Sequence, residues 1–288
     1  MSTANGCPGG DGVNASAKFQ SLNLATVTSL LRTKAFGRRL HLLDTTSSTN
    51  SEAMTLGQEG AEHGTVVIAE QQTAGRGRLG RHWFSPGGAN LYCSVIVRRA
   101  PTEHRLSEWL SWLPLVSAVA AARAIQVVTN LLPSLKWPND IVVGHRKLGG
   151  LLCETGKSAA QGPFVVIGFG LNVNMDRDEF PSDFRDSATS LAAELRHPVD
   201  RTVLLVSLLG ELETHVDSLL QRQGSECINA YSPLCATLGR HVRVNLTDGQ
   251  HLEGLADSIA ADGSLQIIPN DSAASLVRIR AGDVLHLR

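Results

Sequence analysis

The sequence has few cysteines, few aromatic residues and no excess of charge of either sign. Its five cysteines are an odd number and include no Cys-x-x-Cys pair, so neither a disulfide framework nor a zinc site is indicated. Lysine and arginine total 26 against 27 aspartates and glutamates, whereas a protein held on DNA by phosphate contacts needs a basic surface. These shortages predict a cytoplasmic protein that does not bind DNA.

Long apolar runs are missing as well. The longest, residues 113–128, is interrupted by Pro114 and Arg123 and falls short of the ~20 apolar residues that a membrane-spanning helix needs. The first 19 residues contain no basic segment followed by an apolar one, as a secretory signal would. We therefore expect no membrane partner. Hydrophobic residues still make up 42% of the chain, enough for a substantial core.

Three common catalytic signatures are absent. The sequence contains no Gly-x-x-x-x-Gly-Lys-Ser/Thr phosphate loop, no His-Glu-x-x-His zinc motif and no Gly-x-Ser-x-Gly nucleophile turn. P-loop nucleotidases, zinc hydrolases of this type and serine hydrolases with this turn are therefore excluded.

The residue pattern divides the chain into three parts. Residues 1–21 are rich in glycine, serine, asparagine and alanine, and we expect a disordered, dispensable tail. Residues 22–232 mix helical and strand patterns and form one large domain in this interpretation. In residues 233–288, short alternating strands separated by two Asp-Gly turns predict a small β-barrel.

Within the large domain the pattern predicts both helices and strands, hence an α+β fold. Apolar residues recur at helical spacing in residues 22–32, in 106–128 and from Asp200 to Leu219. Strands are expected at residues 39–43, 65–70, 91–98, 134–137, 141–143, 151–154 and 164–169.

The most distinctive segment is a glycine-rich loop with three arginines, residues 75–81, which reads Gly-Arg-Gly-Arg-Leu-Gly-Arg. It matches the Gly-x-Gly-x-x-Gly dinucleotide fingerprint, but that motif requires a helix to follow directly. Residues 82–88, His-Trp-Phe-Ser-Pro-Gly-Gly, do not begin one. We favour a flexible loop that folds over an anion and places guanidinium groups on phosphate or carboxylate. A solvated basic loop is the alternative.

Two further segments could line a ligand site. Residues 136–140 read Lys-Trp-Pro-Asn-Asp, and Lys147 follows at hairpin spacing, which would return Lys147 to Asp140. A surface salt bridge explains that spacing equally well. Residues 168–174, Gly-Phe-Gly-Leu-Asn-Val-Asn, offer close backbone approach and amide groups to a flat ligand. A β-bulge would account for the same glycines.

A polar cluster opens a predicted helix after residue 47. Ser48, Thr49 and Asn50 could be simple helix caps, and Thr49 to Glu52 matches a capping box. Taken in this order, the four segments resemble the biotin protein ligase family, the biotin–[acetyl-CoA-carboxylase] ligases. The matching stretches are SSTNSEA, AEQQTAGRGRLGRHWFSPGGANLYCSV, LKWPND, RKLGGLLCE, GFGLNVN and a C-terminal DGSL…AGDVLHLR, and they extend over about residues 38–288.

The resemblance implies a mixed-sheet catalytic domain flanked by helices, followed by an SH3-like β-barrel. It also implies an enzyme that joins biotin to ATP, giving biotinyl-5′-AMP and pyrophosphate, and then passes biotin to a lysine of a biotin carboxyl carrier domain of a biotin-dependent carboxylase. Mg²⁺ would arrive with ATP, near Asp140, and the resemblance assigns it no certain protein ligand.

Site residues follow by motif from the same resemblance. Lys147, Arg78 and Asp140 would be catalytic. The biotin-binding residues would be Ser48, Thr49, Asn50, Gln72, Arg76, Gly77, Arg78 and Lys147, and the ATP- and adenylate-binding residues would be Arg81, Lys136, Trp137, Asn139 and Asn172.

Some family members carry an N-terminal winged-helix domain and act as repressors. Only about 37 residues precede the matching region here, so we expect a monofunctional ligase. Two other functions compete with this one: a lipoate or octanoate transferase of the same fold, and a non-enzymatic module that senses biotinyl-adenylate. A homodimer is left open by the sequence.

Overall fold

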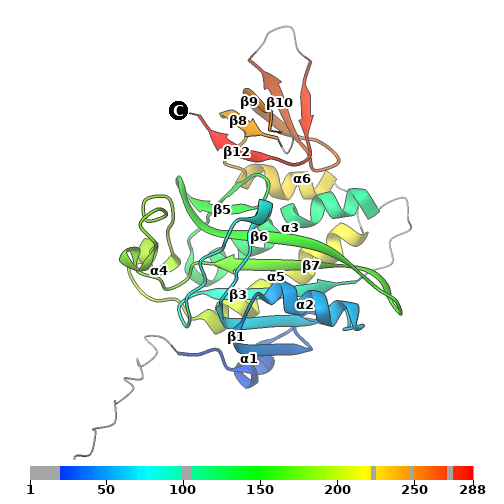
Figure 1. Ribbon diagram of the computed structural model, residues 1–288, viewed down its shortest axis with the longest axis vertical. Helices are drawn as coiled ribbons and strands as arrows, with labels where there is room; N and C mark the ends of the chain where they lie inside the picture. Colours follow the sequence, from blue (N-terminus) through cyan, green and yellow to red (C-terminus); the bar gives the residue numbers. More distant parts are fainter. Residues whose placement is uncertain (1–19, 99–105, 222–224, 247–248, 271–274, 288) are drawn as a thin grey trace, which may run out of the picture.

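The computed structural model describes residues 20–98, 106–221, 225–246, 249–270 and 275–287. Of the predicted tail, residues 1–21, only Gln20 and Ser21 are among them. Figure 1 shows a large part built around one sheet, with a smaller β part next to it that contains the C-terminal strands. The predicted α+β class and the small C-terminal β domain are confirmed.

The large part contains a seven-stranded mixed sheet in the order β1-β2-β3-β7-β6-β5-β4. β1 and β2 pair in parallel, and α2 provides the crossover that a parallel pair requires. The other neighbouring pairs are antiparallel. The strands are β1 (Leu40–Thr46), β2 (Val66–Gln72), β3 (Leu91–Val97), β4 (Ser134–Lys136), β5 (Asp140–Val143), β6 (Arg146–Ser158) and β7 (Gly162–Leu171).

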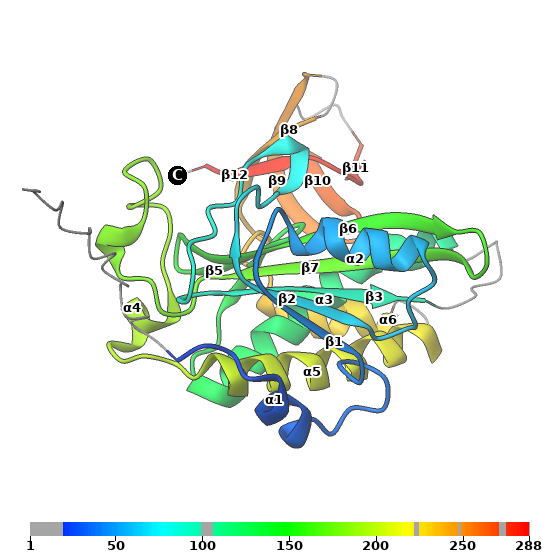
Figure 2. The same ribbon diagram turned by 60° about the horizontal axis from the view of Figure 1, so that its bottom comes forward.

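Helices cover both faces of this sheet (Figure 2). Side chains alternate along each strand, so Val66 and Ile68 join the main core whereas Val67 packs with Ala53 of α2 on the opposite face. α3 and α5 pack against each other on the main-core side. The helices are α1 (Leu24–Leu30), α2 (Thr49–Gln58), α3 (Leu106–Thr129), α4 (Leu191–Leu195), α5 (Arg201–Gln221) and α6 (Ser225–Tyr231).

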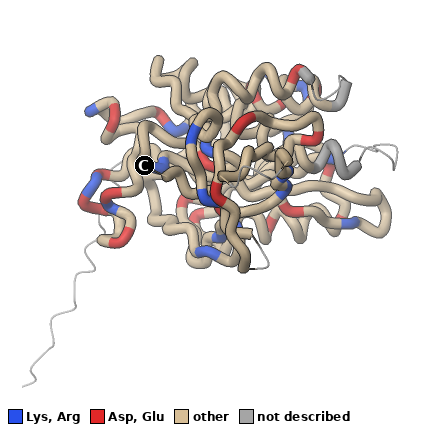
Figure 3. The backbone as a smooth tube through the Cα atoms, turned by 90° about the horizontal axis from the view of Figure 1, so that it is seen from above, with Lys and Arg blue, Asp and Glu red and all other residues tan. Residues whose placement is uncertain are grey.

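Charges of both signs are interspersed along the described chain (Figure 3). Several exposed pairs join opposite charges, such as Arg39 with Glu62 at 2.6 Å and Arg177 with Asp186 at 2.7 Å. Exposed pairs of this kind contribute only about 0–1 kcal/mol each to stability.

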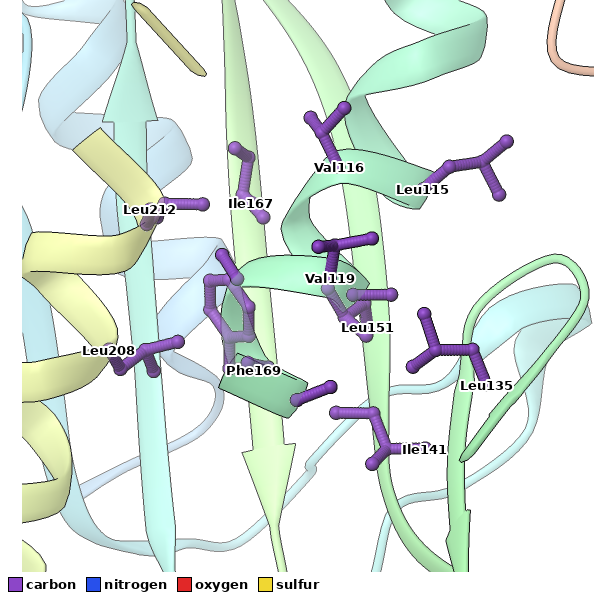
Figure 4. Packing of buried hydrophobic residues seen from close by; sticks show 14 of the residues in the cluster. Leu115, Val116, Val119, Leu135, Ile141, Leu151, Ile167, Phe169, Leu208 and Leu212 are labelled. Atoms are coloured by element: carbon purple, nitrogen blue, oxygen red, sulfur yellow. The ribbon is translucent and has the colours of Figure 1, made fainter. Parts of the chain in front are cut away.

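The most apolar helix lies in the core. Residues 111–129 of α3 are long and apolar enough to cross a membrane, but 67% of that stretch is buried inside the protein. Figure 4 shows its residues Val116 and Val119 beside Ile167 and Phe169 of the sheet. The apolar pattern of this helix therefore follows from its place between α5 and the sheet.

The C-terminal β domain is a five-stranded antiparallel sheet in the order β11-β10-β9-β8-β12. Two tryptophans of the large domain hold its β9–β10 turn: Trp112 Nε1 donates to Ala261 O at 2.9 Å, and Trp137 Nε1 donates to Gly263 O at 3.2 Å. The strands are β8 (His241–Asn245), β9 (His251–Ile259), β10 (Leu265–Pro269), β11 (Val277–Ile279) and β12 (Asp283–His286).

The predicted elements differ from the structure mainly in length. The strand expected at residues 151–154 is the centre of β6, which begins at Arg146. Glycine is a weak strand former, yet Gly149 pairs with Leu171 and Gly150 with Gly170. Pairing with β7 thus extends the strand beyond its sequence signal. The short helices α4 and α6 were not predicted.

Candidate active site

A pocket of about 550 Å³ lies beside the central strands, between residues 76–84, residues 180–188 and the C-terminal β domain. It brings together all but one of the fourteen side chains expected at the site. Those that line it are Ser48, Thr49, Asn50, Gln72, Arg76, Gly77, Arg78, Arg81, Lys136, Asn139, Asp140, Lys147 and Asn172.

One end of the pocket is neutral and polar. Gln72 Oε1 accepts hydrogen bonds from the N–H of Thr49 at 2.9 Å and from its hydroxyl at 3.2 Å. Gln72 Nε2 donates to Ser85 Oγ at 2.9 Å. Ser48 caps α2 without any side-chain hydrogen bond to the helix. This end therefore presents hydroxyl and amide groups to a ligand.

The predicted capping box is wrong. α2 begins at Thr49, and the Glu52 carboxylate accepts from the Thr46 hydroxyl instead of reaching back to the helix end. The Thr49 hydroxyl interacts with Gln72 and Ser94. Thr49 serves the pocket because Gln72 and Ser94, both distant in sequence, bind the hydroxyl that a local cap would use.

Asn50 is fixed in orientation by its neighbours. Ser94 Oγ donates to Asn50 Oδ1 at 2.7 Å, and Asn50 Nδ2 donates to Leu152 O at 3.2 Å and to Glu154 Oε2 at 2.8 Å. Gly168 lies directly against the amide, where a Cβ atom would overlap Asn50 Oδ1. The first glycine of the 168–174 segment is thus required by close approach to Asn50.

The β5–β6 hairpin supplies the next pair of groups. Lys147 Nζ lies 2.7 Å from Asp140 Oδ1, which confirms the contact expected from their spacing. Lys147 Nζ also lies 5.3 Å from the ring centroid of Trp83, within cation–π range. A Cβ at Gly150 would fall 3.4 Å from Lys147 Nζ, so the glycine leaves that ammonium group room.

The arginine loop is tied down at three points, each on a different element. Arg76 Nη2 lies 2.8 Å from Glu154 Oε2 on β6, and Arg78 Nη1 donates to Asn139 Oδ1 at 3.0 Å. Arg81 forms two hydrogen bonds, of 3.2 and 2.6 Å, with the Asp283 carboxylate of β12. No helix follows the loop. The dinucleotide-binding motif requires one, so the structure agrees with the prediction that this loop is not that motif.

Burial and ion pairing shift the pKa values of two of these groups, Arg78 and Asp283. Burial lowers the pKa of Arg78, because desolvation disfavours the charged form. The hydrogen bond from Arg81 lowers the pKa of Asp283, so this carboxylate is ionised at neutral pH. Arg78 therefore gains more than an exposed arginine from an anionic ligand.

Asn172 has a structural part in the pocket wall. Its Nδ2 donates to Thr189 O at 3.0 Å, and the Lys147 N–H donates to Ser187 O at 2.7 Å. The first bond holds Thr189 beside the end of β7, and the second holds Ser187 beside the start of β6. Asn172 thus supports the segment around residues 180–188 besides lining the pocket.

Trp137 lies outside this pocket. Its side chain is 2% exposed, and its indole N–H binds Gly263 O of the C-terminal β domain. Lys136 is the last residue of β4, and Trp137 begins the turn that follows it. The structure places Lys136 in the pocket and uses Trp137 to hold the two domains together.

Comparison with known proteins identifies two family models in the chain. Residues 42–172 match the biotin/lipoate A/B protein ligase family, and residues 237–287 match the biotin protein ligase C-terminal domain. A Mycobacterium tuberculosis biotin–[acetyl-CoA-carboxylase] ligase is 36% identical over 256 residues, 87% of this chain and 90% of that protein. The chain belongs to the biotin protein ligase family.

Other members of this family agree. A Paracoccus denitrificans biotin–[acetyl-CoA-carboxylase] ligase is 31% identical over 78% of this chain and 92% of its own length. Among solved structures, the Aquifex aeolicus biotin protein ligase in complex with biotin and ATP superposes with a TM-score of 0.74. That alignment has 26% identity and covers 87% of this chain and 99% of the other.

Several pocket residues were not found by sequence reasoning. Residues 180–188 contribute two aromatic rings, and the C-terminal β domain contributes a carboxylate and an apolar side chain. The only sequence signal for any of these residues was the presence of aromatic side chains in loop segments. The missed residues include Trp83, Phe180, Phe184, Asp283 and Leu285.

Two carboxylates, those of Asp140 and Asp283, are among the described residues that line the pocket. In the part of the chain that the structure describes, no three His, Cys, Asp or Glu side chains form a group that could hold one. Asp140 is paired with Lys147 and Asp283 with Arg81.

Proposed function

We propose that the chain is an ATP-dependent ligase that activates biotin as biotinyl-5′-AMP and transfers it to one lysine of a biotin carboxyl carrier domain. The observation that carries the proposal is the division of one pocket into a neutral amide-and-hydroxyl end and a strongly cationic side. Biotin combines a ureido ring with a carboxylate, and ATP brings phosphates. Both needs are met within about 550 Å³, a usual size for small-molecule sites.

The neutral end is proposed to hold the ureido ring. A ureido group has two N–H donors and one carbonyl acceptor, so it needs acceptors and donors together. Ser48, Thr49 and Gln72 supply hydroxyl and amide groups, and Asn50 is held at their side. Gly77 lets the loop backbone approach the bound ring.

Adenylation joins the biotin carboxylate oxygen to the α-phosphorus of ATP and releases pyrophosphate. The carboxylate is ionised at neutral pH, so the attack needs no general base. Two anions must instead be brought to bonding distance, which a cation between them stabilises most in the transition state. We assign this role to Lys147, with Arg78 closing over the product.

Other groups are proposed for the nucleotide. Lys136, Arg81 and Asn139 line the side of the pocket beside Asp140 and suit the phosphates, and Asn172 the adenylate. Magnesium is commonly held by one or two carboxylates together with substrate phosphates, so Asp140 fits a Mg²⁺ ion that enters with ATP. Such an ion would neutralise phosphate charge.

In the second step the acceptor lysine attacks the mixed anhydride at its carbonyl carbon, an amide forms, and AMP leaves. The attacking ammonium group must first lose a proton. Asp140 is proposed to orient this group and accept the proton, since it lies next to Lys147 at the reacting end.

Two other functions are less well supported. A lipoate or octanoate transferase would share the 42–172 match, but residues 237–287 match a biotin protein ligase C-terminal domain. A binding module that only senses biotinyl-adenylate would not need Lys147 and Asp140 placed together. We further propose that the ligase acts in the cytoplasm, without DNA or a membrane as partner.

The proposal is tested with biotin, MgATP and an isolated carboxyl carrier domain. We expect one biotinyl group on one carrier lysine by peptide mass spectrometry, and none when that lysine is replaced by arginine. Lipoate and octanoate are offered in parallel. Preferred transfer of either acid would establish the transferase instead, and tight binding of biotinyl-5′-AMP without transfer would leave only the sensing module.

A further inference from the structure

A buried hydroxyl joins the Lys136–Asp140 turn to the last described strand of the C-terminal β domain. The Trp137 N–H donates to Thr237 Oγ1 at 3.1 Å, and Thr237 Oγ1 lies 3.1 Å from Nε2 of His286 on β12. Thr237 is fully buried. One hydroxyl group therefore contacts both domains.

The direction of these bonds follows from counting protons. Thr237 Oγ1 accepts a bond from the Trp137 N–H and has one proton of its own. That proton can go to His286 Nε2 while the Cys235 thiol, another side-chain partner of this hydroxyl, donates to it. This requires a neutral imidazole. Burial, with help from Lys136 and Arg240 nearby, lowers the pKa of His286 to about 4. At neutral pH the ring is uncharged and can accept the bond.

The chain Trp137–Thr237–His286 connects two walls of the pocket. One wall contains Lys136, the residue directly before Trp137, and β12 contributes Leu285, the residue directly before His286. The Ala236 N–H donates to Leu135 O at 2.8 Å, so the backbone at Thr237 is held along β4. The hydroxyl then fixes how far β12 lies from the turn.

We propose that His286, acting through Thr237, is a positioning residue for the adenylation step, an inference that rests on the function proposed above. Neither His286 nor Thr237 is among the described residues that line the pocket. His286 and Thr237 hold Lys136 and the β12 wall at the separation that the nucleotide phosphates need. Displacements of about 1 Å in such groups can reduce rates by about 100-fold.

Ordinary interdomain packing would have a different effect. It would lower stability and impair every catalytic step alike, including transfer from biotinyl-5′-AMP. A positioning role instead singles out the step that uses ATP. The ureido end of the pocket is built on α2 and β2. Asp140, the group proposed to accept the proton in the transfer step, is held separately by the pairing of β5 with Gly150 of β6 and by Lys147. Measuring adenylation and transfer separately therefore distinguishes a positioning role from ordinary interdomain packing.

The experiment compares Thr237→Val with Thr237→Ser in the full chain. Valine keeps the shape and removes the hydroxyl, whereas serine keeps it. We expect valine to raise KM for ATP and lower kcat of adenylation, together by about tenfold or more in kcat/KM. Transfer from pre-made biotinyl-5′-AMP and KM for biotin should change by less than about twofold. Serine should restore adenylation.

His286→Ala should reproduce the valine variant, and the double variant should be no worse than either, since both break one chain of bonds. His251→Ala, an exposed histidine on β9 of the same domain, is the control and should behave as wild type. Melting temperatures identify an assay temperature at which every variant is folded. If Thr237→Val does not fold, His286→Ala with the serine variant decides the matter.

Equal losses in both half-reactions, or no loss in either, would overturn the inference while the wild-type protein still makes biotinyl-5′-AMP. Failure of serine to restore activity would also overturn it. A wild-type protein that forms no biotinyl-5′-AMP would overturn the proposed function itself. Failure of the further inference is therefore seen in the variants, and failure of the proposed function is seen in the wild-type protein.

Discussion

At the scale of single residues, the cations of the pocket are paired with the protein's own carboxylates. Lys147 pairs with Asp140, and Arg81 with Asp283. Substrate anions must compete with these partners before they can be bound. The displaced carboxylates of Asp140 and Asp283 remain in the pocket, so the substrates add negative charge to it. Mg²⁺ that enters with ATP would neutralise part of this added charge.

The first prediction concerns Lys147. Replacing it by alanine should reduce adenylation by about 100-fold or more, because loss of a charge aimed at the transition state costs on the order of 3 kcal/mol. Lys147→Arg should not restore the rate fully, since a planar fork does not replace a compact ammonium group. Pyrophosphate release without acceptor measures this step. Near-normal release by Lys147→Ala would contradict the assignment.

The second prediction concerns Gly168. An alanine Cβ at this position overlaps Asn50 Oδ1, so Gly168→Ala should displace the amide and raise KM for biotin, at a stability cost of about 1–3 kcal/mol. The control is Gly210→Ala on α5, where a Cβ meets no atom within 4 Å. That change should stabilise the protein by roughly 0.5–1 kcal/mol. Equal KM values for biotin in both variants would contradict the proposed contact between Asn50 and biotin.

At the scale of elements, the arginine loop provides the third prediction. We expect residues 73–88 to exchange amide hydrogens faster without ligand than with biotin and ATP. Arg78, which donates to the neutral amide of Asn139, would gain an anionic partner on binding. Asp283→Asn weakens the Arg81 pair, which is partly exposed. It should speed exchange of the free loop by a factor of up to about five, the equivalent of 1 kcal/mol. Equal protection with and without substrates would contradict this expectation.

Short-range spacing predicted part of the site, and long-range packing supplied the rest. The hairpin spacing of Asp140 and Lys147 implied their contact, because a hairpin's register is set locally. The pocket positions of Asp283 and Phe184 depend on how distant segments pack onto the sheet, which no local pattern encodes. Trp137 was expected at the nucleotide because it adjoins Lys136, but its indole N–H binds Gly263 O of the C-terminal domain, a contact between distant segments.

The same contrast holds for whole elements. Long, strongly patterned segments such as α3, expected at residues 106–128 and found at Leu106–Thr129, were predicted almost to the residue. β6 was underestimated because the part containing Gly149 and Gly150 is a strand only through its partner β7. The division between residues 232 and 233 stays a prediction.

At the scale of the whole molecule, the fourth prediction concerns the segment before α1. Arg201, 3% exposed, donates to Gln20 O at 2.8 Å, and the Leu22 N–H donates to Glu70 Oε1 at 2.7 Å. The sequence predicts that residues 1–21 are dispensable, but these bonds move the expected limit to residue 19. A chain that starts at residue 24 should lose about 1–3 kcal/mol by leaving buried polar groups unpaired.

Denaturant unfolding of chains starting at residues 1, 20 and 24 measures this difference. The chain from residue 20 is the matched control and should unfold like the full chain. If the chain from residue 24 is as stable as both, the contacts of Gln20 and Leu22 contribute nothing to stability.

The fifth prediction is a loss of stability in mild acid. Burial lowers the pKa values of His286, to about 4, and of His215. Between the unfolded value of about 6.5 and the folded value, the unfolded chain binds more protons, so stability falls as pH decreases through this range. The melting temperature should therefore drop from pH 7 to pH 5. His286→Gln should give a shallower slope, and an unchanged slope would contradict the prediction.

The pocket takes residues from Ser48 to Leu285, so it is incomplete until nearly all of that sequence has left the ribosome. A nascent chain can fold the ureido end and the central sheet while the β12 wall is still unmade. Partly synthesised chains would then hold biotin at most, without consuming ATP or trapping its reactive adenylate. Activity would begin only when synthesis of the C-terminal domain is finished.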